Sequence, residues 1–250
     1  MTGTRLILCA YHEIGCKVIE HVLQRSDIAD LAVFTHKPVM DAPDLEAFTK
    51  KHGVWCSTEN VSQCKLPFEP DVISSVYYRY IIEPTVIGNV EGRIFNVHPS
   101  LLPRHRGCSA VPWAMIDGDS VTGVTFHYID PGVDTGRVIL QATLPIYATD
   151  TQVTLYQRLM NKGAQFWPAA FELVRESFPG VEQEGEPSYH KRGAPCNGEI
   201  DDRWPIDKIE RFVRAMTFPP YPHASYKGSI IRSLDDYLDL TPPHTPRNRE

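Results

Sequence analysis

The segment Arg93-Ile94-Phe95-Asn96-Val97-His98-Pro99-Ser100-Leu101-Leu102-Pro103 joins a short apolar strand to a stiff loop that contains two prolines. Asn96 and His98 are two positions apart where the strand ends, so both side chains can face one cleft. An amide can donate to an oxygen that gains negative charge, and an imidazole can hold or move a proton near neutral pH. A turn asparagine with a packed histidine is the plain alternative, but the rigid loop after His98 favours a catalytic site.

A second polar segment, Ile129-Asp130-Pro131-Gly132-Val133-Asp134-Thr135-Gly136, follows about thirty residues later. Its Asp134 is flanked by glycines, and a carboxylate there could orient His98 and raise its basicity. A solvated turn aspartate is the alternative, because Asp-Pro-Gly is itself a good turn. Together, Asn96, His98 and Asp134 supply the amide, imidazole and carboxylate that acyl transfer needs.

Apolar strands alternate with helical patterns on the N-terminal side of His98. This alternation predicts an α/β fold with a Rossmann-like, doubly wound and mostly parallel sheet, in which ligands bind at the carboxyl ends of the strands. The expected strands cover residues 5–11, 28–35, 54–56, 71–76 and 93–97, and the expected helices cover 12–24, 44–52 and 84–90.

The pattern changes after His98. It predicts helices over 111–117 and 150–178 and two paired strands over 121–128 and 138–145. Residues 179–197 are polar and rich in Gly and Pro, as a linker would be. A helix over 206–216 and a hairpin over 225–234 are expected after it. We therefore predict a catalytic domain over 1–180 and a small C-terminal helix and hairpin extension over 181–250.

Composition excludes several classes of function. The net charge of the 250 residues is -6 and basic residues form no cluster, which argues against a nucleic-acid partner. No run of eighteen apolar residues predicts a transmembrane helix, and the N-terminus lacks a signal-peptide pattern. The six cysteines form no Cys-x-x-Cys pair. A cytoplasmic protein with reduced thiols and no membrane partner is expected.

Other kinds of site are disfavoured by missing motifs. The first strand-to-helix turn, Ala10 to Gly15, lacks the Gly-x-Gly-x-x-Gly of nicotinamide dehydrogenases. No Gly-x-Ser-x-Gly marks a nucleophilic serine. Metal binding would compete for the same polar side chains, but their spacing is not that of a zinc site, and no metal is predicted. These side chains are His98, His105, His127, Asp130 and Asp134.

Four segments together resemble the N10-formyltetrahydrofolate-dependent formyltransferase family. They are Phe-Asn-Val-His-Pro-Ser-Leu-Leu-Pro-Arg-His-Arg-Gly at 95–107, Thr-Gly-Val-Thr-Phe-His at 122–127, Asp-Pro-Gly-Val-Asp-Thr-Gly at 130–136 and Ser-Val-Tyr-Tyr-Arg-Tyr-Ile-Ile at 75–82. The resemblance covers residues 5–175 and is highly specific. It implies the formyltransferase fold, with Asn96, His98 and Asp134 catalysing direct formyl transfer from N10-formyltetrahydrofolate to an amine.

The resemblance also implies which residues meet the two substrates. The pterin of the folate would lie against two segments, formed by Tyr78, Arg79, Tyr80, Ile81, Ile82, Ile129, Asp130 and Pro131. The acceptor would meet side chains beside the first strand, the fourth strand and the loop after His98. These are Tyr11, His12, Tyr77, Arg104 and His105.

The C-terminal segment 200–222 is similar to that of family members that act on nucleotide-linked amino sugars. The resemblance implies an acceptor such as 4-amino-4,6-dideoxyglucose or perosamine on a nucleoside diphosphate, a product for O-antigen or related lipopolysaccharide, and a homodimer. A glycinamide ribonucleotide or methionyl-tRNA formyltransferase and a formyltetrahydrofolate hydrolase remain the enzymatic alternatives. A non-catalytic folate-binding or sugar-binding module is the alternative from another class.

Overall fold

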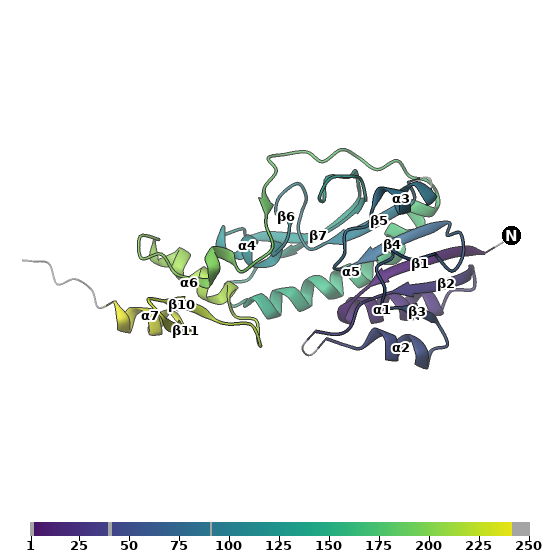
Figure 1. The fold of residues 1–250 in the computed structure, drawn as a ribbon. Helices are drawn as coiled ribbons and strands as arrows, with labels where there is room; N and C mark the ends of the chain where they lie inside the picture. The colour runs from purple at the N-terminus through teal and green to yellow at the C-terminus, as the bar shows by residue number, and fades with distance from the viewer. Residues whose placement is uncertain (1–2, 40–41, 91, 242–250) are drawn as a thin grey trace, which may run out of the picture.

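The computed structural model describes residues 3–39, 42–90 and 92–241. Its central sheet contains β1 (Thr4–Ala10), β2 (Ile28–Phe34), β3 (Trp55–Ser57), β4 (Val72–Val76), β5 (Ile94–His98), β7 (Val121–Tyr128) and β8 (Val138–Pro145). The strands lie in the order β3-β2-β1-β4-β5-β7-β8 (Figure 1). The first five in this order pair in parallel, whereas β7 is antiparallel to both β5 and β8. The predicted doubly wound, mostly parallel α/β fold is confirmed.

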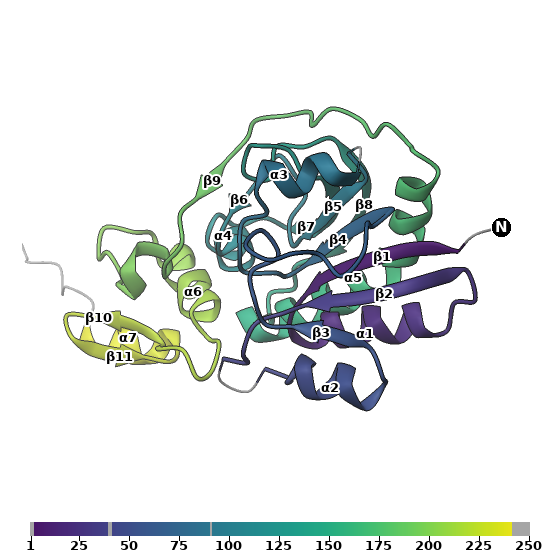
Figure 2. The ribbon, with the colours of Figure 1, turned by 45° about the vertical axis from the view of Figure 1, so that its right-hand side comes forward.

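Helices cover both faces of this sheet. On one face, α1 (His12–Leu23) packs against the long α5 (Gln152–Arg175), with α2 (Leu45–Lys51) beside α1 (Figure 2). The opposite face is covered by α3 (Pro84–Ile87) and η1 (Gly88–Val90), which supply Val86 and Val90 to its apolar cluster.

Side chains of β1 point alternately to the two faces of the sheet, so this one strand contributes to two separate apolar cores. Leu6 and Leu8 belong to the large core on the α1 and α5 face, whereas Ile7 and Cys9 belong to the smaller core on the α3 face. Successive side chains of a strand point to opposite faces, so an unbroken apolar run is what a strand covered on both faces requires.

The C-terminal part lies beside the sheet (Figure 1). It contains β9 (Tyr189–His190), η2 (Pro195–Gly198), α6 (Ile206–Ala215), the hairpin of β10 (Ala224–Tyr226) and β11 (Ser229–Ile231), and α7 (Leu234–Leu240). The chain from α5 reaches it as an arch, along which β9 pairs with β6 (Arg106–Gly107) (Figure 2). We call residues 181–190 the strap. The helix α4 (Ala110–Ile116) packs against α6.

Helix α7 is the main departure from the sequence-based expectation, which extended the hairpin to residue 234. The hairpin ends at Ile231, and Ser233 caps a new helix by accepting from the Asp236 N–H. The signal for this helix was the Ser-x-x-Asp capping pattern. The division at residue 180 stays a prediction, and residues 242–250 of the predicted extension lie outside the described residues.

None of the described helices combines the length and the apolar character that crossing a membrane requires.

The hydrogen bond from the Trp167 indole to Ser74 Oγ joins α5 to β4 inside the core. The two atoms are 2.9 Å apart, and both residues are fully buried. Ser74→Ala would leave the indole N–H without its partner, so the free energy of unfolding should fall by about 1–3 kcal/mol. Urea denaturation measures this loss. Trp167→Phe in the Ser74→Ala background removes the orphaned donor and serves as the control. A Ser74→Ala variant as stable as the parent would contradict the prediction.

Candidate active site

Strands β5 and β7 place two polar pairs on the same face of the sheet. In their antiparallel register, Asn96 lies opposite His127 and His98 lies opposite Thr125. The alternate residues, such as Val97 and Phe126, point into the large core on the α1 and α5 face. The polar side chains therefore all project from the α3 face of the sheet.

Asp134 reaches this face from the loop between β7 and β8. Its Oδ2 lies 3.4 Å from His98 Nδ1, and its Oδ1 lies 3.4 Å from His127 Nε2. The N–H of Gly107 donates to Oδ2 at 2.8 Å. The structure thus brings Asn96, His98 and Asp134 together, as the sequence predicts.

Backbone carbonyls fix which nitrogen of each imidazole carries hydrogen. His98 Nε2 donates to the carbonyl of His105 at 2.8 Å, so Nδ1 of the neutral ring is bare and faces Asp134. His127 Nδ1 donates to its neighbour Tyr128 at 2.8 Å, which leaves Nε2 to accept from the Asn96 amide at 3.3 Å. Asn96 therefore uses one amide hydrogen to hold its orientation and keeps the other for a ligand.

Burial and charge set the protonation of the pair. Burial lowers the pKa of His98 below its ordinary value, although the nearby Asp134 carboxylate opposes that shift. Burial acts to raise the pKa of Asp134, but His98, His127 and the Gly107 N–H outweigh it and hold that pKa well below the usual range. At neutral pH the site therefore holds a carboxylate beside a neutral imidazole that can take up a proton.

The loop that carries Asp134 has a left-handed residue, but not at a glycine. Asp134 itself has φ of 53°, a conformation that aspartate tolerates better than most residues. Gly136 is needed for space instead, since a Cβ there would lie 1.9 Å from the carbonyl oxygen of Tyr128. The unusual backbone angle of this loop thus falls on Asp134, and Gly136 is required by the close approach of β7.

A residue of the strap binds the loop that carries Asp134. Gln183 donates to the carbonyls of Asp134 and Gly136, each at 2.8 Å. Its side-chain oxygen accepts from Arg106 Nη2 at 2.6 Å, next to the Gly107 N–H that binds the carboxylate. One strap residue thus links the two segments that meet at Asp134.

The segments predicted to bind folate meet on the α3 face. Ile82 and Ile129 contribute to the same apolar cluster, and Tyr78 packs against it. Ile81 is 80% exposed, and the Asp130 carboxylate accepts from Thr135 Oγ1 at 2.6 Å, which closes the turn that contains Pro131. Arg79 and Tyr80 lie together at the surface, with the guanidinium 5.6 Å from the ring centroid.

Three of the predicted acceptor residues gather at the carboxyl ends of β1 and β4. Tyr11 packs against His36 with ring centroids 3.7 Å apart and planes tilted by 34°. His12 and Tyr77 both contact the ring of Tyr156 edge to face. His12 Nδ1 and the Tyr77 hydroxyl are buried and have no hydrogen-bond partner among the described residues. Both residues also have positive φ, near 60°. Buried polar atoms without partners are uncommon and mark a place where a ligand can bind.

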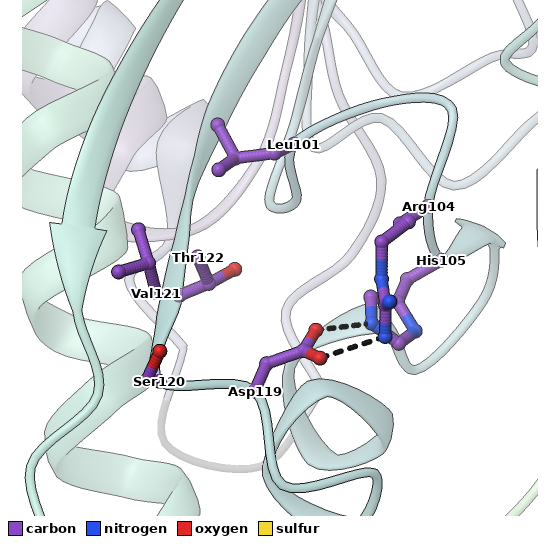
Figure 3. A pocket seen from close by; sticks show the side chains of 7 residues that line it. All are labelled: Leu101, Arg104, His105, Asp119, Ser120, Val121 and Thr122. Atoms are coloured by element: carbon purple, nitrogen blue, oxygen red, sulfur yellow. Dashed lines mark hydrogen bonds and ion pairs between the residues drawn. The ribbon is translucent and has the colours of Figure 1, made fainter. Parts of the chain in front are cut away.

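The other two predicted acceptor residues lie elsewhere, on the loop after His98. Arg104 and His105 both bond to Asp119, at 2.7 and 2.8 Å, and line a cavity of about 230 Å³ (Figure 3). His105 is only 2% exposed, and its carbonyl orients His98. The structure therefore does not bring the five predicted acceptor residues together as one group.

Three groups that form the site were not assigned to it from the sequence. The sequence suggests His127 only as a metal ligand, although its place on the polar side of an alternating strand is a signal that it could face the site. The backbone N–H of Gly107 and the side chain of Gln183 have no signal in the sequence, because their roles depend on where the strap lies.

A family model described as formyl transferase matches residues 11–171. GDP-perosamine N-formyltransferases of Brucella melitensis biotype 1 and Brucella abortus are each 34% identical to this chain over 223 residues, which is 86% of this chain and 86% of theirs.

Solved structures share the fold. A sugar 3-N-formyltransferase called WlaRD, determined with dTDP and 5-N-formyl-THF, gives a TM-score of 0.77 at 22% identity over 92% of this chain and 85% of its own. An N-formyltransferase of Helicobacter canadensis, determined with folinic acid and dTDP-3-aminofucose, gives 0.74 at 20% identity over 92% and 87%. With the family match over most of the sequence, the chain belongs to the formyl transferase family, as its motifs predicted.

Proposed function

We propose that this enzyme transfers a formyl group from N10-formyltetrahydrofolate to the amino group of a nucleotide-linked amino-dideoxy sugar. The observation that carries the proposal is the meeting of Asn96, His98 and Asp134 on one face of the sheet. The curated relatives, which are GDP-perosamine N-formyltransferases, support an amino-sugar acceptor and a product for surface polysaccharide such as O-antigen.

Each of the three side chains has a distinct part in the reaction. The neutral amine attacks the formyl carbon, and the carbonyl oxygen gains negative charge towards the free amide hydrogen of Asn96. The amine loses a proton to the bare Nδ1 of His98, directly or through water, and the Asp134 carboxylate stabilises the resulting imidazolium. The C–N10 bond then breaks, and the proton passes from His98 to N10. A formamide and tetrahydrofolate are the products.

The folate would bind where the two exposed loops of the α3 face approach each other. The shared cluster of Ile82 and Ile129 supplies an apolar floor. Both segments are irregular, so backbone groups that form no ladder can face the polar edge of a pterin, although the Ile129 N–H already donates to the carbonyl of Ile94.

The acceptor would bind beside the unpaired polar atoms of His12 and Tyr77. These atoms can bond the hydroxyl or phosphate oxygens of a nucleotide sugar, and the ring of Tyr156 covers the apolar side. Arg104 and His105 remain proposed acceptor contacts, and any such contact would come from the cavity wall beside Asp119.

We also propose a homodimer and a cytoplasmic location. Exposed apolar side chains on the C-terminal extension support the dimer, because such surfaces often mark subunit contacts. These side chains are Ile230, Leu238 and Leu240. The location rests on the composition of the chain.

A panel of acceptors tests the proposed activity. Incubated with N10-formyltetrahydrofolate, the protein should formylate at least one amino sugar linked to GDP, dTDP or UDP, detected by mass spectrometry as a gain of one formyl group. Glycinamide ribonucleotide and methionyl-tRNA in parallel reactions serve as controls. Release of formate without a formylated amine would show the hydrolase instead and contradict the proposal.

Asn96→Ala removes the donor to the developing oxyanion. Loss of one such donor costs about 2.7–4 kcal/mol of barrier, so kcat for formylation should fall about 10²–10³-fold. Asn161→Ala is the matched control, because Asn161 lies exposed on α5 and its amide oxygen contacts Lys17. Turnover in Asn96→Ala within tenfold of the parent would remove Asn96 from the mechanism.

Titration of His98 tests how its protonation is set. Burial lowers its pKa while Asp134 raises it, so the parent should titrate below pH 6.5 and Asp134→Asn should titrate lower still. Carbon-proton NMR of the imidazole Cε1–H measures both, with the His98→Gln spectrum assigning the resonance. A midpoint above 6.5 in the parent, or an increase in Asp134→Asn, would contradict this account.

A further inference from the structure

Two imidazoles and a carboxylate meet outside the candidate active site. His105 comes from the loop after β5, Asp117 from the end of α4 and His190 from the strap. His105 Nδ1 lies 3.0 Å from His190 Nε2 and 4.0 Å from Asp117 Oδ2, and the three ligand atoms lie within 4.8 Å of one another. Tetrahedral zinc holds imidazole nitrogens at about 2.0–2.1 Å, which places them about 3.3 Å apart. The two imidazole nitrogens are within a few tenths of an ångström of this spacing, and the exposed carboxylate of Asp117 would have to move about 1 Å closer.

The hydrogen bond between His105 Nε2 and Asp119 leaves His105 Nδ1 as the nitrogen that can bind a metal. His105 Nε2 donates to Asp119 at 2.8 Å (Figure 3). Nδ1 of the neutral ring is therefore bare, and it lies 3.0 Å from His190 Nε2. A histidine ligand normally donates its other ring N–H to a carboxylate or carbonyl in this way. Arg104 bonds the second oxygen of Asp119 at 2.7 Å and fixes the carboxylate in turn.

The second imidazole is also held in place without a metal. The ring of His190 stacks on Trp113, with centroids 4.5 Å apart and planes 8° from parallel. Its carbonyl accepts from the Cys108 N–H at 2.9 Å, beside the β6 and β9 pairing. Asp117 is exposed, which leaves the cluster open to an ion from solvent. The ligands are therefore positioned before binding, and an ion has a route to them.

We propose that His105, Asp117 and His190 form a binding site for a divalent transition metal, with zinc as the best match to two imidazoles and one carboxylate. A water molecule would complete the coordination. The sequence predicted no metal from the spacing of a set that shares only His105 with this site, and Asp117 and His190 carry no metal motif. Three segments of the fold bring them together, and the site lies apart from the three proposed catalytic side chains.

The metal would tie the strap to the loop that orients His98. The carbonyl of His105 accepts from His98 Nε2, and the strap residue Gln183 holds the loop of Asp134. A metal that joins His105 to His190 would therefore hold more rigidly the two segments that orient His98 and Asp134, namely the loop after β5 and the strap. The metal has a structural role in this proposal. When it is bound, both ring nitrogens of His105 are occupied, and of the proposed acceptor contacts Arg104 and His105, Arg104 is the one left to contact the acceptor.

Metal binding to the purified full-length chain tests the site directly. After chelation and dialysis, the protein should bind one zinc per chain by elemental analysis, and cobalt should give the visible absorption of a tetrahedral site that zinc abolishes. Thermal unfolding followed by circular dichroism should show a higher Tm with zinc, because a ligand of the native state stabilises it. None of these measurements depends on formyl transfer. A failure to bind zinc would therefore contradict the metal site and leave the proposed function untouched.

Variants distinguish this site from adventitious binding. Asp117→Asn and His190→Gln should each weaken zinc binding at least tenfold, and Asp119→Asn should weaken it about 10–100-fold through its effect on His105. His21→Gln, which changes an exposed histidine on α1, should bind as the parent does. Asp117 is exposed, so its variant should stay folded even if the His190 variant does not. Absence of stoichiometric binding, or parent-like affinity in Asp117→Asn, would overturn the proposal.

Discussion

The carboxylate of Asp134, held between two imidazoles, is the interaction on which the rest of the site depends. Its oxygens lie 3.4 Å from His98 and from His127, and the Gly107 N–H donates to it. A buried carboxylate is costly unless it is hydrogen-bonded or paired with a positive charge, so the Gly107 N–H and an imidazole that can be protonated must be in place together. Each is supplied by a different segment, and the site can exist only when the whole sheet edge has formed.

The switch from parallel to antiparallel pairing creates this edge. Strand β5 continues the parallel part of the sheet, and β7 runs back along it so that His127 faces Asn96. The loop after β7 can then return to the same face with Asp134.

The strap connects the candidate active site with the proposed metal site. Gln183 bonds the Asp134 loop, and His190 reaches the ring of His105. Both contacts act on segments that orient His98, one through its carboxylate neighbour and one through its carbonyl partner. A segment that composition marks as a linker thus forms part of the support of the site.

The sequence alone determined the mostly parallel sheet, since apolar runs and amphipathic periods are local signals, and it identified Asn96, His98 and Asp134 through their motifs. It did not predict α7, because the capping pattern at Ser233 overlaps the end of the predicted hairpin. Only the tertiary structure decided that His127 orients Asn96, that Gln183 holds the Asp134 loop and that His105, Asp117 and His190 converge. These contacts join residues distant in the chain, and their geometry depends on strand register and on the path of the strap, neither of which local pattern encodes.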